Sequence, residues 1–214
     1  SIEDKKGIEY LTTRHDDNPE LKDGWENALE SIIDFDKHLA DRGIKLFVMP
    51  VPGKASVYPE YLSGYKMEGT LNEKTLQLIE NLKALNIGTV DLSALMNKEK
   101  KISEKDLYLK QDTHWSPDGM HFSAEEVVKK LIASGITQKG NHEYKLKKVE
   151  MSRQGDVLGM LQISGISDRY PDENVECHQV VDAKSKQKYE DDPDADVLII
   201  GDSFLRIYER DEPY

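Results

Sequence analysis

The sequence predicts an α/β fold, a three-layer sandwich in which a mostly parallel central sheet carries helices on both faces. Short apolar runs rich in β-forming residues alternate along the chain with longer stretches of helical spacing. Those helical stretches are long enough to cross over a sheet, as the connections between parallel strands require. No repeat, low-complexity tract or Pro/Gly/Ser-rich linker divides the 214 residues, so we expect residues 1–214 to form a single domain.

The N-terminal part predicts a helix followed by a strand. The first twenty residues are polar, and we expect them to be irregular. Apolar residues at helical spacing then predict a helix over residues 25–40, which stops before Gly43. The apolar run 44–51 ends at Pro52-Gly53, and its β-forming residues predict a strand that is buried on both faces.

The alternation of helix and strand continues through most of the chain. The further elements that spacing predicts are helices over residues 72–85 and 117–133 and buried strands over residues 87–92 and 197–200. The region around residues 144–182 breaks this alternation. The elements expected there are a strand over residues 145–151, a short helix over residues 155–161 and a strand over residues 175–181. In such a fold the active site lies at the carboxyl ends of the parallel strands, where crossover loops meet.

Composition and charge exclude several classes of partner. The net charge of −12 argues against nucleic acid, because phosphate binding depends on clustered Lys and Arg. Cys177 is the only cysteine, so an internal disulfide and a cysteine-rich metal site are excluded. No stretch approaches the roughly 18 apolar residues of a membrane span. No signal-peptide pattern precedes Ser1, and we expect that any targeting segment has been removed.

Ser203 is the first candidate for a chemical role. It lies in the turn Gly201-Asp202-Ser203, which follows a predicted strand and is expected to open a helix. In this position its hydroxyl can attack an electrophile while its backbone N–H donates to an oxyanion. The alternative is structural, because either Ser203 or Asp202 can cap the helix by accepting from a free backbone N–H.

Asp112 and His114 are the second pair of candidates. They precede a helix whose start is marked by Ser116 as N-cap and Pro117 at the first position. Because they are two residues apart in an expected extended loop, their side chains point to one side. A carboxylate on one ring nitrogen fixes the tautomer of a catalytic histidine, whose other nitrogen takes the serine proton. Asp112 and His114 therefore fit this pairing, although a merely structural hydrogen bond remains an alternative.

A metal site is a weaker interpretation of the same loop. Two candidate ligands need a third, and the remaining histidines lack ligand spacing. These histidines are His15, His38, His121, His142 and His178. His121 is interpreted as a surface or packing residue, and we expect neither a metal nor a cofactor.

The motifs, taken together, resemble a known superfamily. The loop Asp112-Thr113-His114-Trp115 and the turn at Ser203 resemble the SGNH-hydrolase superfamily, and more closely its alginate O-acetyltransferase branch, whose members pair an Asp-x-His-Trp loop with a serine turn. Residues 48–60 look like the Pro-x-Pro-x-Lys-x-x-x-Tyr-Pro segment of that branch. Ordinary SGNH esterases have the serine first, whereas here the Asp/His loop precedes Ser203 by about ninety residues. The acetyltransferase branch is similar in having this reversed order.

The resemblance implies an O-acetyltransferase that acts on a carbohydrate or exopolysaccharide. It implies a Ser-His-Asp triad in which Ser203 forms an acetyl-serine intermediate, His114 transfers protons and Asp112 orients His114. It also implies an extracytoplasmic enzyme with a polysaccharide or oligosaccharide acceptor and a membrane-bound O-acyltransferase partner that supplies acetyl groups. Two other functions stay open: a carbohydrate O-acetyl esterase, and a non-catalytic carbohydrate-binding module in which no His114 nitrogen reaches Ser203.

Several neighbouring residues are candidates for binding or for the oxyanion hole. The residues expected to bind substrate are Lys54, Trp115, Arg206 and Tyr208, with stacking on sugar expected for Trp115 and a structural role as the alternative for each. The amide of Gly53 is a candidate second donor to the oxyanion. Only eleven residues follow Ser203, too few for a further helix and strand, so we expect the chain to be truncated after Tyr214.

Overall fold

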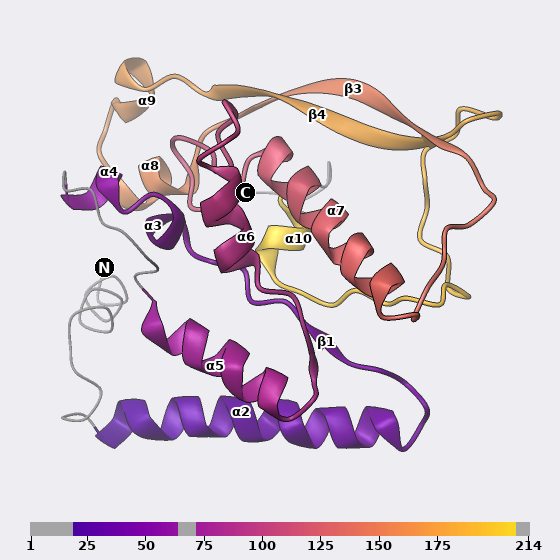
Figure 1. Ribbon diagram of the computed structural model, residues 1–214. Coiled ribbons are helices and arrows are strands. Elements are labelled where there is room, and N and C mark those ends of the chain that lie inside the picture. Colours follow the sequence, from indigo (N-terminus) through magenta and orange to yellow (C-terminus); the bar gives the residue numbers. More distant parts are fainter. Residues whose placement is uncertain (1–18, 64–71, 209–214) are drawn as a thin grey trace. The chain divides into compact units, whose positions relative to one another are not determined.

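The computed structural model of the protein describes residues 19–63 and 72–208, which fall into two compact units (Figure 1). The smaller unit comprises residues 19–51 and 72–91, and the larger comprises residues 52–63 and 92–208. Of the first twenty residues, predicted to be irregular, residues 1–18 lie outside the described part of the chain, whereas Pro19 and Glu20 belong to a helix.

The smaller unit pairs helices with a short parallel ladder. Its elements are α2 (Pro19–Ala40), β1 (Phe47–Val48), α5 (Glu73–Ala84) and β2 (Gly88–Thr89). Strands β1 and β2 are parallel, with Phe47 opposite Gly88. A side chain at Gly88 would lie 2.8 Å from the Phe47 ring, so glycine permits this close pairing.

Both helices predicted for this unit are confirmed. Helix α2 begins six residues earlier than predicted and ends before Gly43, which has a φ of +73°. Helix α5 is capped by Asn72, whose Oδ1 accepts from Thr75 N at 3.1 Å. The prediction that residues 44–51 are buried on both faces is wrong: residues 44 and 45 are exposed, residues 46–51 are half-buried, and only Phe47 and Val48 pair.

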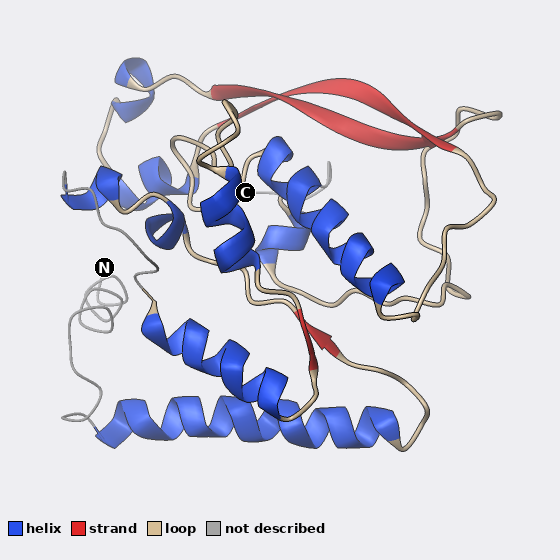
Figure 2. Cartoon of the chain, viewed as in Figure 1, coloured by secondary structure: helices blue, strands red, loops and turns tan. Residues whose placement is uncertain are grey.

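The larger unit carries a long antiparallel hairpin beside the long helix α7 and several short helices (Figure 2). Its elements are α3 (Lys54–Val57), α4 (Glu60–Ser63), α6 (Leu92–Glu99), α7 (Pro117–Ala133), β3 (Tyr144–Arg153), α8 (Asp156–Leu161), α9 (Ile166–Arg169), β4 (Glu173–Asp182) and α10 (Ser203–Arg206). Strands β3 and β4 pair along their whole length, from Tyr144 opposite Asp182 to Arg153 opposite Glu173. The predicted strands 145–151 and 175–181 and the short helix at 155–161 are therefore confirmed.

The core of the larger unit surrounds the segment that leads to Asp112. Leu107, Tyr108 and Leu109 are three consecutive buried residues, each at most 2% exposed. Helix α6 contributes Leu92 and Met96, which are fully buried. Within the described part of the chain, no helix has the length and apolar character that a membrane span requires.

The strand predicted over residues 197–200 is wrong. In the described structure this segment pairs with no strand, and the exposed fractions of Leu198, Ile199 and Ile200 are 83%, 63% and 77%. An apolar run of β-forming residues forms a strand only if a neighbouring strand supplies its backbone hydrogen bonds. The described residues supply no such partner here. The α/β class itself is confirmed, with one parallel and one antiparallel pair of strands.

Candidate active site

The loop that carries Asp112 and His114 is closed at its base by backbone pairing. Tyr108 and Trp115 form an antiparallel bridge, and Leu109 N donates to His114 O at 3.1 Å. Helix α7 begins at once after the loop. Ser116 is its N-cap, with Oγ accepting from Gly119 N at 3.0 Å, and Pro117 follows. The predicted helix start, with Ser116 as N-cap and Pro117 at the first position, is confirmed.

Asp112, His114 and Ser203 form one hydrogen-bonded chain. Asp112 is 0% exposed, and its Oδ1 lies 2.6 Å from His114 Nδ1. Because an ionised carboxylate only accepts, Nδ1 carries the proton, which leaves Nε2 of the neutral ring as an acceptor. Ser203 Oγ lies 2.7 Å from that Nε2 and donates to it. The described geometry therefore brings together the three residues that were predicted from motifs about ninety positions apart.

The turn before α10 leaves the Ser203 hydroxyl available to His114. Asp202 is the N-cap of α10, and its Oδ1 accepts from Phe204 N at 3.0 Å. The capping role that was the structural alternative for Ser203 thus belongs to its neighbour. The Phe204 ring lies against the imidazole of His114, with 4.7 Å between ring centroids, and packs on the ring that accepts from Ser203.

The Asp112 carboxylate accepts three hydrogen bonds. Besides the His114 ring, it accepts from His114 N at 2.9 Å and from Asp156 N at 3.2 Å. The guanidinium of Arg153 lies 3.4 Å from Oδ2. Burial alone would raise the pKa of the Asp112 carboxyl, but these bonds from His114 and Asp156 outweigh burial and hold the pKa below its ordinary value. Asp112 is therefore ionised at neutral pH.

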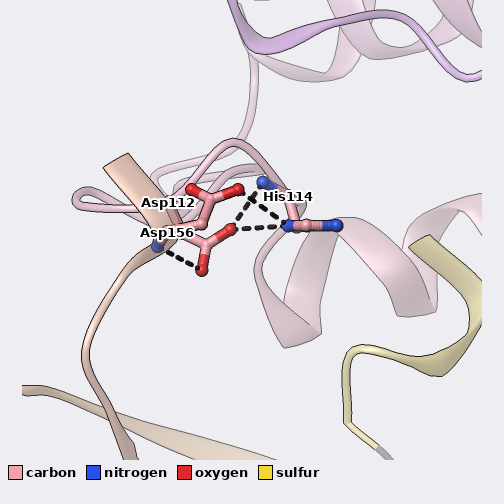
Figure 3. A group of neighbouring side chains, drawn as sticks. All are labelled: Asp112, His114 and Asp156. Carbon is pink, nitrogen blue, oxygen red and sulfur yellow. Dashed lines mark hydrogen bonds and ion pairs between the residues drawn. The ribbon is translucent and has the colours of Figure 1, made fainter. Parts of the chain in front are cut away.

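Asp156 adds a second carboxylate on the same side of the imidazole (Figure 3). Its Oδ1 accepts from Thr113 N at 2.7 Å, and its Oδ2 accepts from the Thr113 hydroxyl. Oδ2 also lies 3.5 Å from His114 Nδ1. Asp112, His114 and Asp156 are, within the described part of the chain, the one group whose ligand atoms cluster as a metal site would require. Here, however, these atoms are hydrogen-bonded to one another and to the loop.

Lys54 supports the loop by hydrogen bonds to its backbone. Its ammonium donates to three backbone carbonyls, those of Leu109 at 2.6 Å, Lys110 at 2.9 Å and Asp112 at 3.1 Å. An ammonium has three N–H donors, and all three are used. Burial lowers the pKa of Lys54, while nearby carboxylates, Glu173 first among them, oppose this. These contacts favour the structural alternative for Lys54 over the predicted substrate-binding role.

Glu173, the first residue of β4, holds the outer side of the loop. Its carboxylate accepts from Lys110 N at 2.9 Å and from Gln111 N at 3.3 Å. Gln111 Nε2 in turn donates to Pro171 O at 3.0 Å. Backbone groups that have no partner within the loop are thus satisfied by charged side chains from other elements.

Helix α10 is tied to the loop by hydrogen bonds that use two of the predicted substrate-binding residues. Trp115 Nε1 donates to Phe204 O at 2.9 Å, and Tyr208 OH donates to Trp115 O at 2.7 Å. Arg153 Nη1 adds a bond to Ile207 O at 2.9 Å. Trp115 is 2% exposed and therefore offers no open face for stacking on a sugar. These contacts favour the structural alternative for Trp115 and Tyr208. Arg206 is exposed on α10, and its role stays a prediction.

The other described histidines each contact a carboxylate. His38 pairs with Asp34, His121 with Glu125, His142 with Asp182 and His178 with Glu176. His121 is exposed, in line with its interpretation as a surface residue. His15 lies outside the described residues.

Arg153, Asp156 and Glu173 were missed by the sequence analysis. They lie 41 to 63 positions along the chain from the loop residues that they contact, and they stand at or next to the end of the β3–β4 ladder where Arg153 pairs with Glu173. The one local signal was Gly155-Asp156 before an apolar run. This pattern indicates a helix start, but it does not indicate which residues Asp156 contacts.

Comparison with protein families gives one match across most of the chain. Residues 10–209 match the family described as the SGNH hydrolase-like domain of acetyltransferase AlgX. Among curated proteins, the chain is 26% identical over 151 residues to the probable alginate O-acetylase AlgJ of Pseudomonas aeruginosa, which covers 70% of this chain and 37% of that protein. AlgJ of Pseudomonas fluorescens is 25% identical over 172 residues, 78% of this chain and 43% of the relative. The chain therefore spans less than half the length of these relatives.

Solved structures support the same fold. The O-acetyltransferase domain of Pseudomonas putida AlgJ aligns with a TM-score of 0.63 at 21% identity, covering 75% of this chain and 57% of that one. Pseudomonas aeruginosa AlgX aligns with a TM-score of 0.57 at 22% identity, covering 76% of this chain and 38% of that one. At these identities the likeness shows an SGNH hydrolase-like α/β fold.

Proposed function

The chain belongs to the family of the SGNH hydrolase-like domain of acetyltransferase AlgX, and on that basis we propose that it is an O-acetyltransferase that modifies a polysaccharide through Ser203, His114 and Asp112. The observation that supports this proposal best is the chain of two hydrogen bonds, 2.6 Å from His114 Nδ1 to Asp112 Oδ1 and 2.7 Å from Ser203 Oγ to His114 Nε2. Each residue has the partner that its proposed role requires.

In the first half of the reaction, Ser203 is acetylated. His114 Nε2 takes the hydroxyl proton while Ser203 Oγ attacks the acetyl carbonyl of the donor. The tetrahedral intermediate collapses when the bond from the carbonyl carbon to the donor breaks, and the imidazolium returns its proton to the departing donor group. The products of this step are acetyl-Ser203 and the deacetylated donor.

In the second half, the acetyl group moves to the acceptor. A sugar hydroxyl gives its proton to His114 Nε2 and its oxygen attacks the carbonyl carbon of acetyl-Ser203. When the bond to Oγ breaks, the imidazolium returns its proton to Ser203. The enzyme is regenerated and the sugar oxygen carries the acetyl group.

Asp112 stabilises the imidazolium that forms in both halves. Its ionised carboxylate accepts from Nδ1, which keeps Nε2 free to act as a base. The backbone N–H of Ser203, at the first position of α10, is a donor for the oxyanion of the tetrahedral intermediate. We propose the backbone N–H of Gly53, the N-cap of α3, as the second donor to this oxyanion.

The acceptor class is inferred from the named relatives. AlgJ is described as a probable alginate O-acetylase, and its match to this chain supports a polysaccharide acceptor. We further propose that the protein works outside the cytoplasm and receives acetyl groups through a membrane-bound O-acyltransferase.

The test supplies the protein with an acetyl ester donor and an alginate oligosaccharide acceptor, and measures acetylated sugar and free acetate. Acetylated sugar is expected from the wild-type chain, with a loss of nearly all transfer in Ser203→Ala and His114→Ala. Free acetate without acetylated sugar would favour the esterase alternative. Full transfer by Ser203→Ala would exclude the proposed mechanism.

The binding-module alternative has less support. That alternative expects no His114 nitrogen within reach of Ser203, whereas the two lie in direct hydrogen-bond contact. Binding of the oligosaccharide without acetyl transfer, unchanged in Ser203→Ala, is the result that would favour it.

A further inference from the structure

Asp156 lies outside the proposed triad but contacts two of its members and the residue between them. Its backbone N–H donates to Asp112 Oδ2, its carboxylate accepts from both donors of Thr113, and its Oδ2 lies 3.5 Å from His114 Nδ1. The side chain is one-quarter exposed, so its charge is only partly screened by water. Figure 3 shows both carboxylates on the Nδ1 side of the imidazole.

Charged groups gather on the Nδ1 side of His114. Two carboxylates, Asp112 and Asp156, face Nδ1, and the guanidinium of Arg153 lies at Asp112 Oδ2. On the other side the ring meets the neutral Ser203 hydroxyl and the Phe204 ring. Arg153 and the Lys54 ammonium, which interacts with both carboxylates, offset part of this negative charge. Asp112 and Asp156 are the charged groups that lie 2.6 and 3.5 Å from Nδ1, so they are placed to stabilise the imidazolium of the reaction.

Capping of α8 does not account for the Asp156 side chain. The N-cap of α8 is Gly155, and no side chain caps this helix. Asp156 is the first helical residue, and its carboxylate extends to Thr113, the residue between Asp112 and His114 in the loop. The carboxylate thus acts on the loop rather than on its own helix.

We propose that Asp156 is a second positioning carboxylate for His114, which holds the loop through Thr113 and stabilises the imidazolium by its charge. The inference rests on the proposed function and adds a residue to it. Asp112 remains the hydrogen-bond partner of Nδ1, and Asp156 acts on the same ring from 3.5 Å.

The test measures kcat and KM for release of nitrophenolate from 4-nitrophenyl acetate. Asp156→Asn keeps an oxygen acceptor for Thr113 but loses the charge, and it should lower kcat roughly tenfold with KM changed less than about twofold. Thr113→Val removes the hydroxyl bond and leaves the carboxylate, so its effect on kcat should be smaller. Asp168→Asn on α9 is the matched control and should equal wild type. Circular dichroism checks that each variant is folded.

A double-mutant cycle separates a direct effect on His114 from an effect transmitted through Asp112. If the charge acts on His114, Asp156→Asn should lower kcat by a further factor of roughly ten in the Asp112→Asn background. An Asp112→Asn/Asp156→Asn double variant equal to Asp112→Asn alone would overturn the proposal, as would wild-type kcat in a folded Asp156→Asn. Ser203→Ala separates failure of the proposed function from failure of the Asp156 inference. If Ser203→Ala releases nitrophenolate at the wild-type rate, the proposed function fails as well. If Ser203→Ala loses release but Asp156→Asn has no effect, only the inference about Asp156 is overturned.

Discussion

Three hydrogen bonds of the site converge on the carboxylate of Asp112. Asp112 is fully buried, yet its carboxylate accepts from two groups of His114 and from Asp156 N. A buried carboxylate is tolerated only when its oxygens are satisfied in this way. The same bonds that orient His114 therefore also stabilise the fold while Asp112 is ionised.

Acid should weaken the fold through Asp112. Because its pKa is lowered in the folded state, Asp112 contributes stability that is fully present above its ordinary value of 3.8 and is lost as the pH falls through the folded-state pKa. We expect Asp112→Asn to be less stable than wild type by about 2 to 3 kcal/mol at neutral pH, the scale of hydrogen bonds to a charged group. Denaturant unfolding at several pH values should show this difference shrinking below pH 3.8, and a constant difference would contradict the prediction.

Lys54 should matter for stability rather than for substrate affinity. Lys54→Met removes three hydrogen bonds from loop carbonyls, including that of the buried Leu109, and should cost about 2 to 4 kcal/mol of unfolding free energy. Lys110→Met, whose side chain belongs to an exposed residue of the same loop, is the control and should change stability little. An unchanged unfolding midpoint together with a raised KM in Lys54→Met would instead favour the substrate-binding role.

Sequence reasoning succeeded where the chemistry was local. The spacing of Asp112 and His114, the Ser116-Pro117 helix start and the Ser203 turn are short-range patterns, and the structure brings the predicted residues into contact. Partners such as Arg153 and Glu173 could not be predicted, because their contacts depend on how strands far along the chain pair.

At the scale of elements, the junction between β3 and α8 is the main support of the loop. Within four residues it supplies Arg153 and Asp156, and between them Gly155 lies against the backbone of Gln111. A Cβ at Gly155 would lie 1.9 Å from Gln111 O, so no other residue fits without displacing the loop.

Gly155→Ala should therefore disturb both stability and activity. The clash is with backbone, which cannot move aside cheaply, and we expect a loss of about 2 to 4 kcal/mol and a lower acetyl-transfer rate. Gly159→Ala in the same helix is the matched control, because a Cβ there meets nothing within 4 Å and alanine favours helix. Thermal unfolding of the two variants compares them, and equal midpoints would contradict this reading of the junction.

The amphipathic helices α5 and α7 were predicted better than the buried strands. Amphipathic spacing and caps lie within the sequence of the helix itself, and α5 and α7 have the predicted bounds to within a residue. A strand depends on a partner that the local sequence does not contain. Residues 197–200 have the composition of a buried strand, but without a partner among the described residues they are irregular, and residues 198–200 are exposed.

At the scale of the whole molecule, the α/β class and the resemblance to the acetyltransferase branch are confirmed by the family match and the solved structures. The order of the motifs, with the Asp/His loop before the serine, was the feature that favoured this branch over ordinary esterases. The expectation of a single domain stays a prediction. The described chain forms two compact units, and the chain crosses between them more than once.

The central claim is that Ser203 carries the acetyl group between donor and acceptor. Mass spectrometry of the protein after brief incubation with 4-nitrophenyl acetate measures it most directly, with Ser203→Ala treated in parallel. One acetyl group on the peptide that contains Ser203, absent from the variant and removed when an oligosaccharide acceptor is added, is the predicted result. An unmodified Ser203 peptide at a time when acetyl transfer is under way would contradict the account.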